Sequence, residues 1–143
     1  MQLTAYTDYA LRVLMFAAVK NDLCRVEEIA SSFAISEHHV RKVVHALGRE
    51  GLLDNIRGKH GGFRLSRPPE RINLGAVVRS TEANLVLVEC FDPEENRCRL
   101  TPRCSLKQAL NRALRAFLSV LDEYTLADLT KPSLAAELGL KRR

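Results

Sequence analysis

The 143-residue chain contains no apolar run approaching the ~20 residues that a membrane-spanning helix needs. Asp8 and Arg12 lie inside a helical pattern, so we expect folded structure at the N-terminus rather than a cleaved signal. The sequence also lacks a glycine-rich phosphate loop followed by Lys-Ser or Lys-Thr. No nucleophile–base pair is recognisable near the cysteines, which argues against an enzyme. We therefore expect a non-enzymatic cytoplasmic protein with no membrane partner, in which thiols stay reduced.

The net charge of +5 is spread unevenly along the chain. Residues 36–67 carry seven basic and three acidic side chains, together with all four histidines. Residues 82–96 carry five acids and no base, whereas residues 97–115 carry six bases and no acid. A basic block near the N-terminus indicates a polyanionic partner, although a charged run is by default only a solvated face.

Apolar periodicity predicts three helices in the N-terminal half. The first is capped by Thr4 and runs to about Lys20, and the second covers residues 26–33. Ser36 caps the third helix. This helix ends at Gly51, at a position that commonly adopts the left-handed conformation favoured by glycine. The third helix has an apolar stripe for burial, formed by Val40, Val43, Val44 and Leu47. Its opposite face is polar and carries His38, His39, Arg41, Lys42 and His45.

Two short strand-like runs follow at residues 52–57 and 63–66, joined by the glycine-rich tip GKHGG. Two helices, a polar-faced third helix and a basic hairpin predict a winged helix-turn-helix domain over residues 1–81, which binds double-stranded DNA. The third helix then enters the major groove and the hairpin reaches the backbone or minor groove. A small helical domain with an ordinary surface hairpin is the alternative. The predicted DNA-binding residues are Ser36, His38, His39, Arg41, Lys42, Arg57, Lys59 and His60.

The C-terminal half contains a long amphipathic helix. Ser105 and Gln108 form a capping-box pattern, and the helix they open is predicted to run to about Tyr124. Apolar residues recur along it in a coiled-coil-like seam at Leu110, Leu114, Phe117, Leu121 and Tyr124. We interpret residues 105–130 as a dimerisation helix of a homodimer, the alternative being a helix packed in its own core. Residues 131–143 are expected to form a short tail whose end, Lys141, Arg142 and Arg143, is frayed.

Residues 82–104 form a predicted loop that holds three of the four cysteines, Cys90, Cys98 and Cys104. A structural zinc or a dithiol redox centre usually shows a Cys-x-x-Cys pair, and none occurs here. An iron–sulfur cluster tolerates longer spacings but commonly needs four ligands, so a fourth must come from elsewhere. The fourth cysteine, Cys24, is expected to be a small buried apolar residue.

Several segments resemble one known family: LTAYTDYALRVL, VRKVVHALGREGLL, IRGKHGGFRL, INLGAVVRSTE, LVECFD and CSLKQALNRALRAFLSVLDEYTLADL. They are similar to the family of iron–sulfur winged-helix regulators that includes IscR, and the similarity spans nearly the whole chain. The fold that it implies is mainly α with a small β-hairpin wing and a long dimerisation helix. Two departures concern DNA specificity: His60 replaces the first of three wing glycines, and Glu37 stands where a base is common.

The resemblance also implies a cofactor and a signal. It implies a homodimeric repressor with one [4Fe-4S] cluster per subunit, [2Fe-2S] being the alternative. Cys90, Cys98 and Cys104 match the thiolate ligands, and Asp8 matches a carboxylate ligand donated from the partner subunit. Nitric oxide would attack the iron, and the repressor would release promoters of nitric-oxide-detoxification genes.

Three readings stay open beside this one. The chain could respond to iron or cluster status, or sense oxidants directly through its thiols. Asp8 could also be an ordinary first-turn acid, favoured by the helix dipole and paired with Arg12 four residues later.

Overall fold

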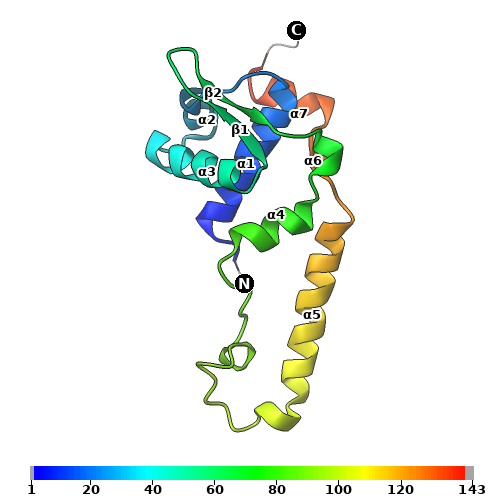
Figure 1. Cartoon of the computed structure of the whole chain (residues 1–143). Helices are drawn as coiled ribbons and strands as arrows, with labels where there is room; N and C mark the ends of the chain where they lie inside the picture. Colours follow the sequence, from blue (N-terminus) through cyan, green and yellow to red (C-terminus); the bar gives the residue numbers. More distant parts are fainter. Residues whose placement is uncertain (1, 141–143) are drawn as a thin grey trace.

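The computed structural model describes residues 2–140 and shows a mainly helical chain with one two-stranded sheet (Figure 1). The helices are α1 (Ala5–Lys20), α2 (Val26–Phe33), α3 (Glu37–Arg49), α4 (Leu74–Thr81), α5 (Ser105–Asp122), α6 (Leu126–Leu129) and α7 (Pro132–Glu137), and the strands are β1 (Leu53–Ile56) and β2 (Gly62–Leu65). Across this described part, no helix is both long and apolar enough to cross a bilayer. The predicted fold class, mainly α with a β-hairpin wing, is confirmed.

Helix α1 runs through the centre of the core. Thr4 caps it as predicted, because its Oγ1 accepts the Thr7 N–H at 3.3 Å. The residues of α1 that are buried recur at helical spacing and include Ala10, Val13 and Phe16. Helices α2, α3, α4, α6 and α7 and strand β2 all contact α1. Most of the elements of the fold therefore depend on this one helix for their burial.

Helix α3 begins and ends as the sequence predicts. The Ser36 Oγ accepts the His39 N–H at 3.4 Å, and all four residues of the predicted apolar stripe are buried. Gly51 follows the helix at a φ of 68°, in the left-handed region. The Leu52 N–H then returns to the Leu47 carbonyl at 2.9 Å, which satisfies one of the last free carbonyls of the helix. This packing directs the polar face of α3 outward.

The hairpin is antiparallel, with register from Leu53 opposite Leu65 to Ile56 opposite Gly62. Its base is anchored to the turn between α1 and α2, because Cys24 and Phe63 exchange two backbone hydrogen bonds of 2.7 and 2.9 Å. Phe63 is also buried in the core. The base of the wing is therefore fixed, while its tip at residues 57–60 stays exposed.

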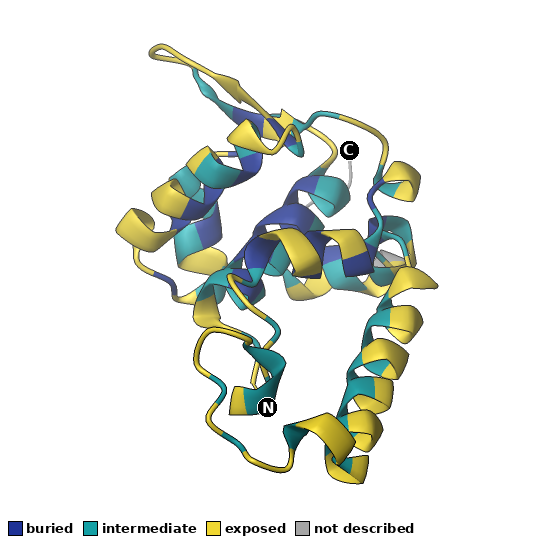
Figure 2. Cartoon of the chain, turned by 60° about the horizontal axis from the view of Figure 1, so that its bottom comes forward, coloured by how far each residue is buried: buried dark blue, intermediate teal, exposed yellow. Residues whose placement is uncertain are grey.

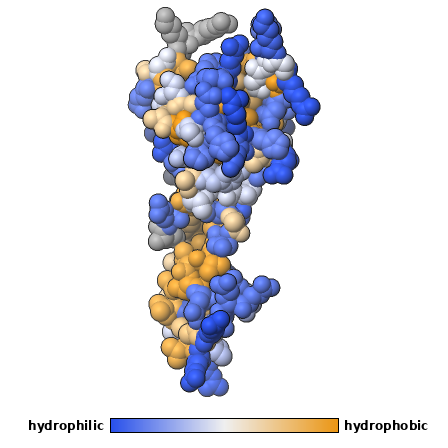
Figure 3. Space-filling model, turned by 90° about the vertical axis from the view of Figure 1, so that its left-hand side faces the viewer, coloured by the Kyte–Doolittle hydropathy of each residue, from blue (hydrophilic) through white to orange (hydrophobic). Residues whose placement is uncertain are grey.

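The region after α4 has no core of its own. Between residues 82 and 125, all of which are described, no residue is buried, and α5 and the preceding loop extend away from the N-terminal domain (Figures 1 and 2). Hydrophobic side chains gather on one face of this extension (Figure 3). Leu106 and Val120 on α5 are 65% and 52% exposed. A face of exposed apolar side chains is typical of a surface that a partner covers.

The predicted long helix differs in detail from the observed one. Its N-cap is Cys104 rather than Ser105, because the Cys104 Sγ accepts the Lys107 N–H at 3.4 Å. The prediction of Ser105 as the cap was therefore wrong by one residue. The helix also stops at Asp122, and α6 begins after Thr125. A separate capping box starts α6, in which Asp128 accepts hydrogen bonds of 2.7 Å from the Thr125 N–H and hydroxyl.

The segment beyond Thr130 is more ordered than a tail. Residues 132–137 form α7, which contacts α1 and buries Ala135. Leu138 and Leu140 pack against the core from the same segment. The prediction of a frayed end at Lys141, Arg142 and Arg143 lies outside the described residues.

Glu82 joins the start of the loop to the start of α1. Its Oε1 accepts the Thr4 N–H at 2.8 Å and the Thr4 hydroxyl at 3.1 Å. Burial alone would raise the pKa of Glu82, but hydrogen bonds from Thr7 and Thr4 together outweigh it and lower that pKa. The carboxylate therefore stabilises the N-terminus of α1 in its charged form.

We expect Glu82→Gln to lower the free energy of unfolding at pH 7 by about 1 kcal/mol, because a neutral amide is a weaker acceptor. Since the folded-state pKa of Glu82 is lowered, its contribution is present above the unfolded pKa of about 4.3 and is lost as the pH falls through the lower folded value. Urea unfolding of both proteins at pH 7 and near pH 3 measures this. The exposed Glu70→Gln is the control, and a wild-type advantage that persists at low pH would contradict the assignment.

Candidate nucleic-acid interface and metal-binding loop

The outward face of α3 presents the predicted DNA-binding side chains. His38, His39, Arg41 and Lys42 are all exposed. Ser36 is occupied as the helix cap, with its Oγ also 3.0 Å from the His39 Nδ1. The face is therefore rich in donors and suited to contact base edges or phosphates.

Two carboxylates hold Arg41 in the free chain. Its Nη2 lies 2.6 Å from Glu37 Oε2, four residues earlier on α3, and 3.5 Å from Glu27 Oε1 on α2. All three side chains are about half exposed, so these ion pairs contribute little stability. Glu37 thus has a partner on its own helix in addition to the favourable helix dipole. Arg41 is able to exchange these carboxylates for phosphate at small cost.

The wing tip places Arg57, Lys59 and His60 together in solvent. A groove between the wing and α3 is lined by Arg41 and Lys59 and also by Arg25 and Asn55. Sequence reasoning missed Arg25 and Asn55 as members of this surface. No local pattern marks them, because only the packing of the start of α2 beside strand β1 of the wing brings them there.

The three loop cysteines are half-buried and free of disulfides. Among the described residues, no three His, Cys, Asp or Glu side chains lie close enough together to hold a metal ion. The structure therefore places Cys90, Cys98 and Cys104 on one loop but does not bring their sulfurs to one centre. Assembly of a site would require the loop to close.

Local hydrogen bonds order this loop around Cys98. The Asn96 Oδ1 accepts the Cys98 N–H and the Thr101 hydroxyl, each at 3.1 Å. The Asp92 Oδ1 accepts the Glu94 N–H at 2.9 Å in a similar turn. Sequence reasoning missed Asn96, although an Asn two residues before a cysteine is a recognisable signal for such a turn.

Cys104 sits at the N-terminus of α5, where its sulfur accepts a backbone N–H. A helix N-terminus favours negative charge, and residues 97–115 around it carry six bases and no acid. Both effects suit a thiolate, the form that ligates metal. Three free thiols on one loop could supply three of the four ligands that an iron–sulfur cluster commonly needs.

Asp8 lies in the first turn of α1, and Arg12 holds its carboxylate. The Arg12 Nε donates to Asp8 Oδ1 at 3.0 Å, and Arg12 Nη2 lies 2.8 Å from Oδ2. The Asp8 side chain is nevertheless 46% exposed. The alternative reading, an i to i+4 ion pair, therefore describes the isolated chain, and the carboxylate stays accessible to a second subunit.

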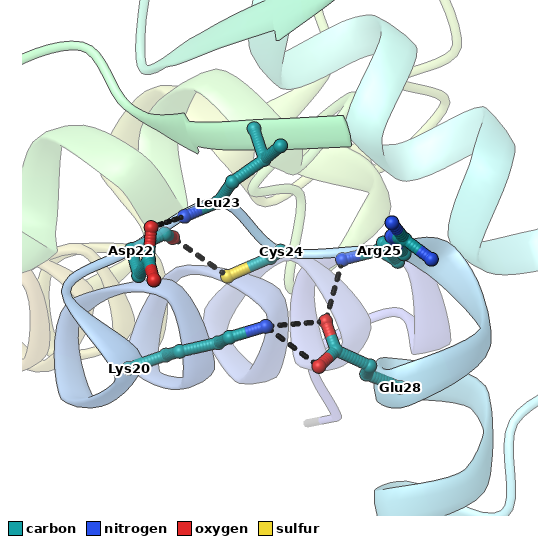
Figure 4. A network of polar contacts seen from close by, with 6 residues as sticks. All are labelled: Lys20, Asp22, Leu23, Cys24, Arg25 and Glu28. Atoms are coloured by element: carbon teal, nitrogen blue, oxygen red, sulfur yellow. Dashed lines mark hydrogen bonds and ion pairs between the residues drawn. The ribbon is translucent and has the colours of Figure 1, made fainter. Parts of the chain in front are cut away.

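Cys24 is also a free cysteine, but it is buried, unlike the three in the loop, and Figure 4 shows its surroundings. It is fully buried, its Sγ donates to the Asp22 carbonyl at 3.4 Å, and burial raises its pKa to about 12. The Lys20 Nζ and the Glu28 Oε1 form an ion pair of 2.6 Å beside Cys24. The prediction of a buried structural cysteine is confirmed, and this thiol is not poised for metal binding or oxidation.

Comparison with known proteins identifies the family. Residues 3–132 match the family described as "Rrf2: Iron-dependent Transcriptional regulator". The chain is 53% identical over 131 residues to the HTH-type transcriptional regulator NsrR of Bacillus licheniformis, covering 90% of this chain and 92% of that protein. It is 52% identical to the protein of the same name from Geobacillus kaustophilus, covering 100% and 99%.

A solved structure supports the same assignment. The global cysteine regulator CymR of B. subtilis superposes with a TM-score of 0.74 at 29% identity, covering 91% of this chain and 96% of that one. These relatives are transcriptional regulators and not enzymes, as the sequence led us to expect. The chain is a DNA-binding transcriptional regulator, and it belongs to the Rrf2 family.

Proposed function

We propose that the protein is a cytoplasmic, homodimeric repressor whose iron–sulfur cluster senses nitric oxide and whose release frees promoters of nitric-oxide-detoxification genes. The observation that carries the proposal is the position of the three-thiol loop. The loop leaves the DNA-binding domain at Glu82, which is bonded to the start of α1. About 50% identity to regulators named NsrR supports the nature of the signal.

DNA binding is assigned to α3 and the wing. Lys42 on α3 and Lys59 on the wing tip are both exposed, and the groove between the two elements is lined by further basic side chains. In a winged helix-turn-helix protein, the third helix reads the major groove while the wing follows the backbone. Ser36, His38, His39, Arg41, Arg57 and His60 complete the proposed surface.

The dimer is assigned to α5. Leu106 and Val120 on this helix are 65% and 52% exposed, and none of its residues is buried in the single chain. A second copy that covers the apolar face of α5 removes this exposure symmetrically. Two α3 helices then face half-sites roughly 34 Å apart on one side of the duplex.

The cluster, a [4Fe-4S] centre in this proposal, would be held by Cys90, Cys98, Cys104 and the partner subunit's Asp8. When bound, it supplies iron sites that react with nitric oxide. Arg12 holds Asp8 in the single chain, so a ligand role requires Arg12 to release that carboxylate. Asp8 lies one turn from Thr4, which is hydrogen-bonded to Glu82. Replacing Arg12 by iron as the partner of Asp8 would therefore change the contacts of the first turn of α1.

The alternative is a regulator that responds to iron or cluster status, with a [2Fe-2S] centre as the alternative cofactor. The description of the Rrf2 family as iron-dependent supports it. The two functions separate when DNA release is measured under iron depletion and under nitric oxide addition. Release by nitric oxide with iron supply held constant supports the nitric oxide sensor.

The first prediction concerns the DNA surface. Lys42→Ala and Lys59→Ala should each weaken binding to a mixed-sequence DNA duplex and reduce the slope of log affinity against log salt by about 1, because each removes one phosphate contact. Fluorescence anisotropy over a range of salt concentrations measures both quantities. Arg112→Ala on α5 is the control, and its slope should equal that of the wild type. A salt dependence that is already flat in the wild type would refute the assignment.

The second prediction concerns the ligands. Anaerobically purified wild type should show the visible absorbance of an iron–sulfur cluster, and Cys98→Ala should lose it, while the buried Cys24→Ala retains it. Asp8→Ala should retain iron but change the titration with nitric oxide, because a carboxylate is a weaker ligand than thiolate. A colourless wild type loaded with zinc would contradict the proposal, and an unchanged titration of Asp8→Ala would make Asp8 structural.

A further inference from the structure

The C-terminal end of α5 is attached to the DNA-binding domain by a dense set of hydrogen bonds. The Asn73 side chain donates to the carbonyls of Asp122 and Tyr124 at 2.8 and 3.4 Å. The Leu74 N–H donates to the Tyr124 carbonyl at 2.9 Å, and the Leu126 N–H donates to the Ile72 carbonyl at 2.8 Å. The segment before α4 is thus bonded to the segment after α5 on both sides of Asn73.

A bidentate ion pair braces the same contact. The two terminal nitrogens of Arg79 on α4 each lie 2.6 Å from one carboxylate oxygen of Asp122, the last residue of α5. Their hydrogen bond lowers the pKa of Asp122 and raises that of Arg79. A fork-to-fork pair fixes direction as well as distance, because both donors and both acceptors are used.

Gly75 leaves room beside α4 for the Arg79–Asp122 ion pair. A Cβ at this position would overlap the Asp122 Oδ1 and press on the Arg79 guanidinium. Gly75 is itself buried on α4. A larger residue at position 75 must therefore displace the Asp122 carboxylate or the Arg79 guanidinium and so disturb their ion pair. We name Asn73, Gly75, Arg79 and Asp122 the α4–α5 joint.

The joint lies between the parts of the molecule that the proposed function assigns to dimerisation and to DNA. Helix α4 contacts α1, which in turn contacts α3. Helix α5 packs against α4, while none of its own residues is buried in the domain (Figure 1). In a dimer formed along α5, the angle at the joint therefore sets the direction in which each domain projects. By symmetry, any change in this angle occurs twice.

We propose that the α4–α5 joint sets the spacing between the operator half-sites that the dimer accepts, so that Arg79 and Asp122 are positioning residues for DNA recognition. This inference rests on the proposed dimer and DNA surface. One added base pair moves a half-site by about 3.4 Å and rotates it by about 35° around the helix axis. A dimer with a rigid joint binds a site of the altered spacing more weakly, whereas a dimer with a loosened joint can adjust to it.

The test selects binding sites from a pool of duplex DNA with a randomised core, using the full-length cluster-loaded protein. Wild type, Arg79→Met, Asp122→Asn and Gly75→Ala are compared. Wild type should select inverted repeats of one spacing and prefer it at least about tenfold over spacings one base pair longer or shorter. The three variants should select the same half-site sequence. Their preference for one spacing over spacings one base pair longer or shorter should be no more than about threefold.

Lys20→Met is the matched control, because it removes an equally short ion pair that lies inside the DNA-binding domain. It should leave the preferred spacing unchanged. Variants that keep the spacing preference of the wild type would overturn the inference and leave the proposed function intact. Variants that no longer select the half-site sequence would also overturn the inference, because the joint would then affect more than spacing. A wild-type pool without paired half-sites would overturn the proposed dimeric readout, and this inference with it. Native mass spectrometry checks that each variant is folded and has the same subunit number.

Discussion

Among the described residues, one hydrophobic core is built around α1, and α5 with the loop before it lies outside that core. Helix α1 is in contact with most of the other elements, whereas no residue from 82 to 125 is buried within the described chain. Burial of apolar area is the main favourable term in folding, so an 18-residue amphipathic helix without it is not stable alone. The proposed second copy would supply the burial that α5 lacks in the single chain.

Two sets of polar contacts connect the loop and α5 to the DNA-binding domain. At one end, Glu82 bonds the start of the cysteine loop to Thr4 at the beginning of α1. At the other, Arg79 and Asp122 brace the end of α5 against α4. The loop and α5 thus form a closed path that leaves the DNA-binding domain at one point and returns at another. A change in the loop has a physical route to α1, and a change in the α5 pair has a route through α4.

Features set by local interactions were predictable from the sequence. The Thr4 and Ser36 caps and the left-handed Gly51 all depend on residues within one helical turn, and the structure confirms each of them. The cap at Cys104 was missed because capping rules favour hydroxyl and carboxamide oxygens over sulfur, so that Ser105 drew the prediction. The break before α6 was missed although Thr125 and Asp128 carry a capping signal, because the apolar seam continues through Tyr124.

Features set by tertiary packing were not predictable in this way. Arg25 and Asn55 reach the groove beside the wing only because α2 and β1 pack there, and the anchoring of Phe63 by Cys24 joins segments far apart in sequence. The burial of Gly75 against Asp122 is a contact of the same kind. The candidate ligands came from cysteine spacing and family resemblance, and the proposed site would draw on a second subunit and a metal, which no single-chain pattern encodes.

We propose that the exposed loop and α5 are completed by a second copy of the chain and an iron–sulfur cluster. Native mass spectrometry of anaerobically purified protein tests it most directly, because the mass reports subunits and inorganic atoms together. The account predicts a species of two chains carrying two [4Fe-4S] clusters, with loss of iron or gain of nitric oxide mass when nitric oxide is added. A monomer, or a dimer free of iron and sulfide, would contradict it.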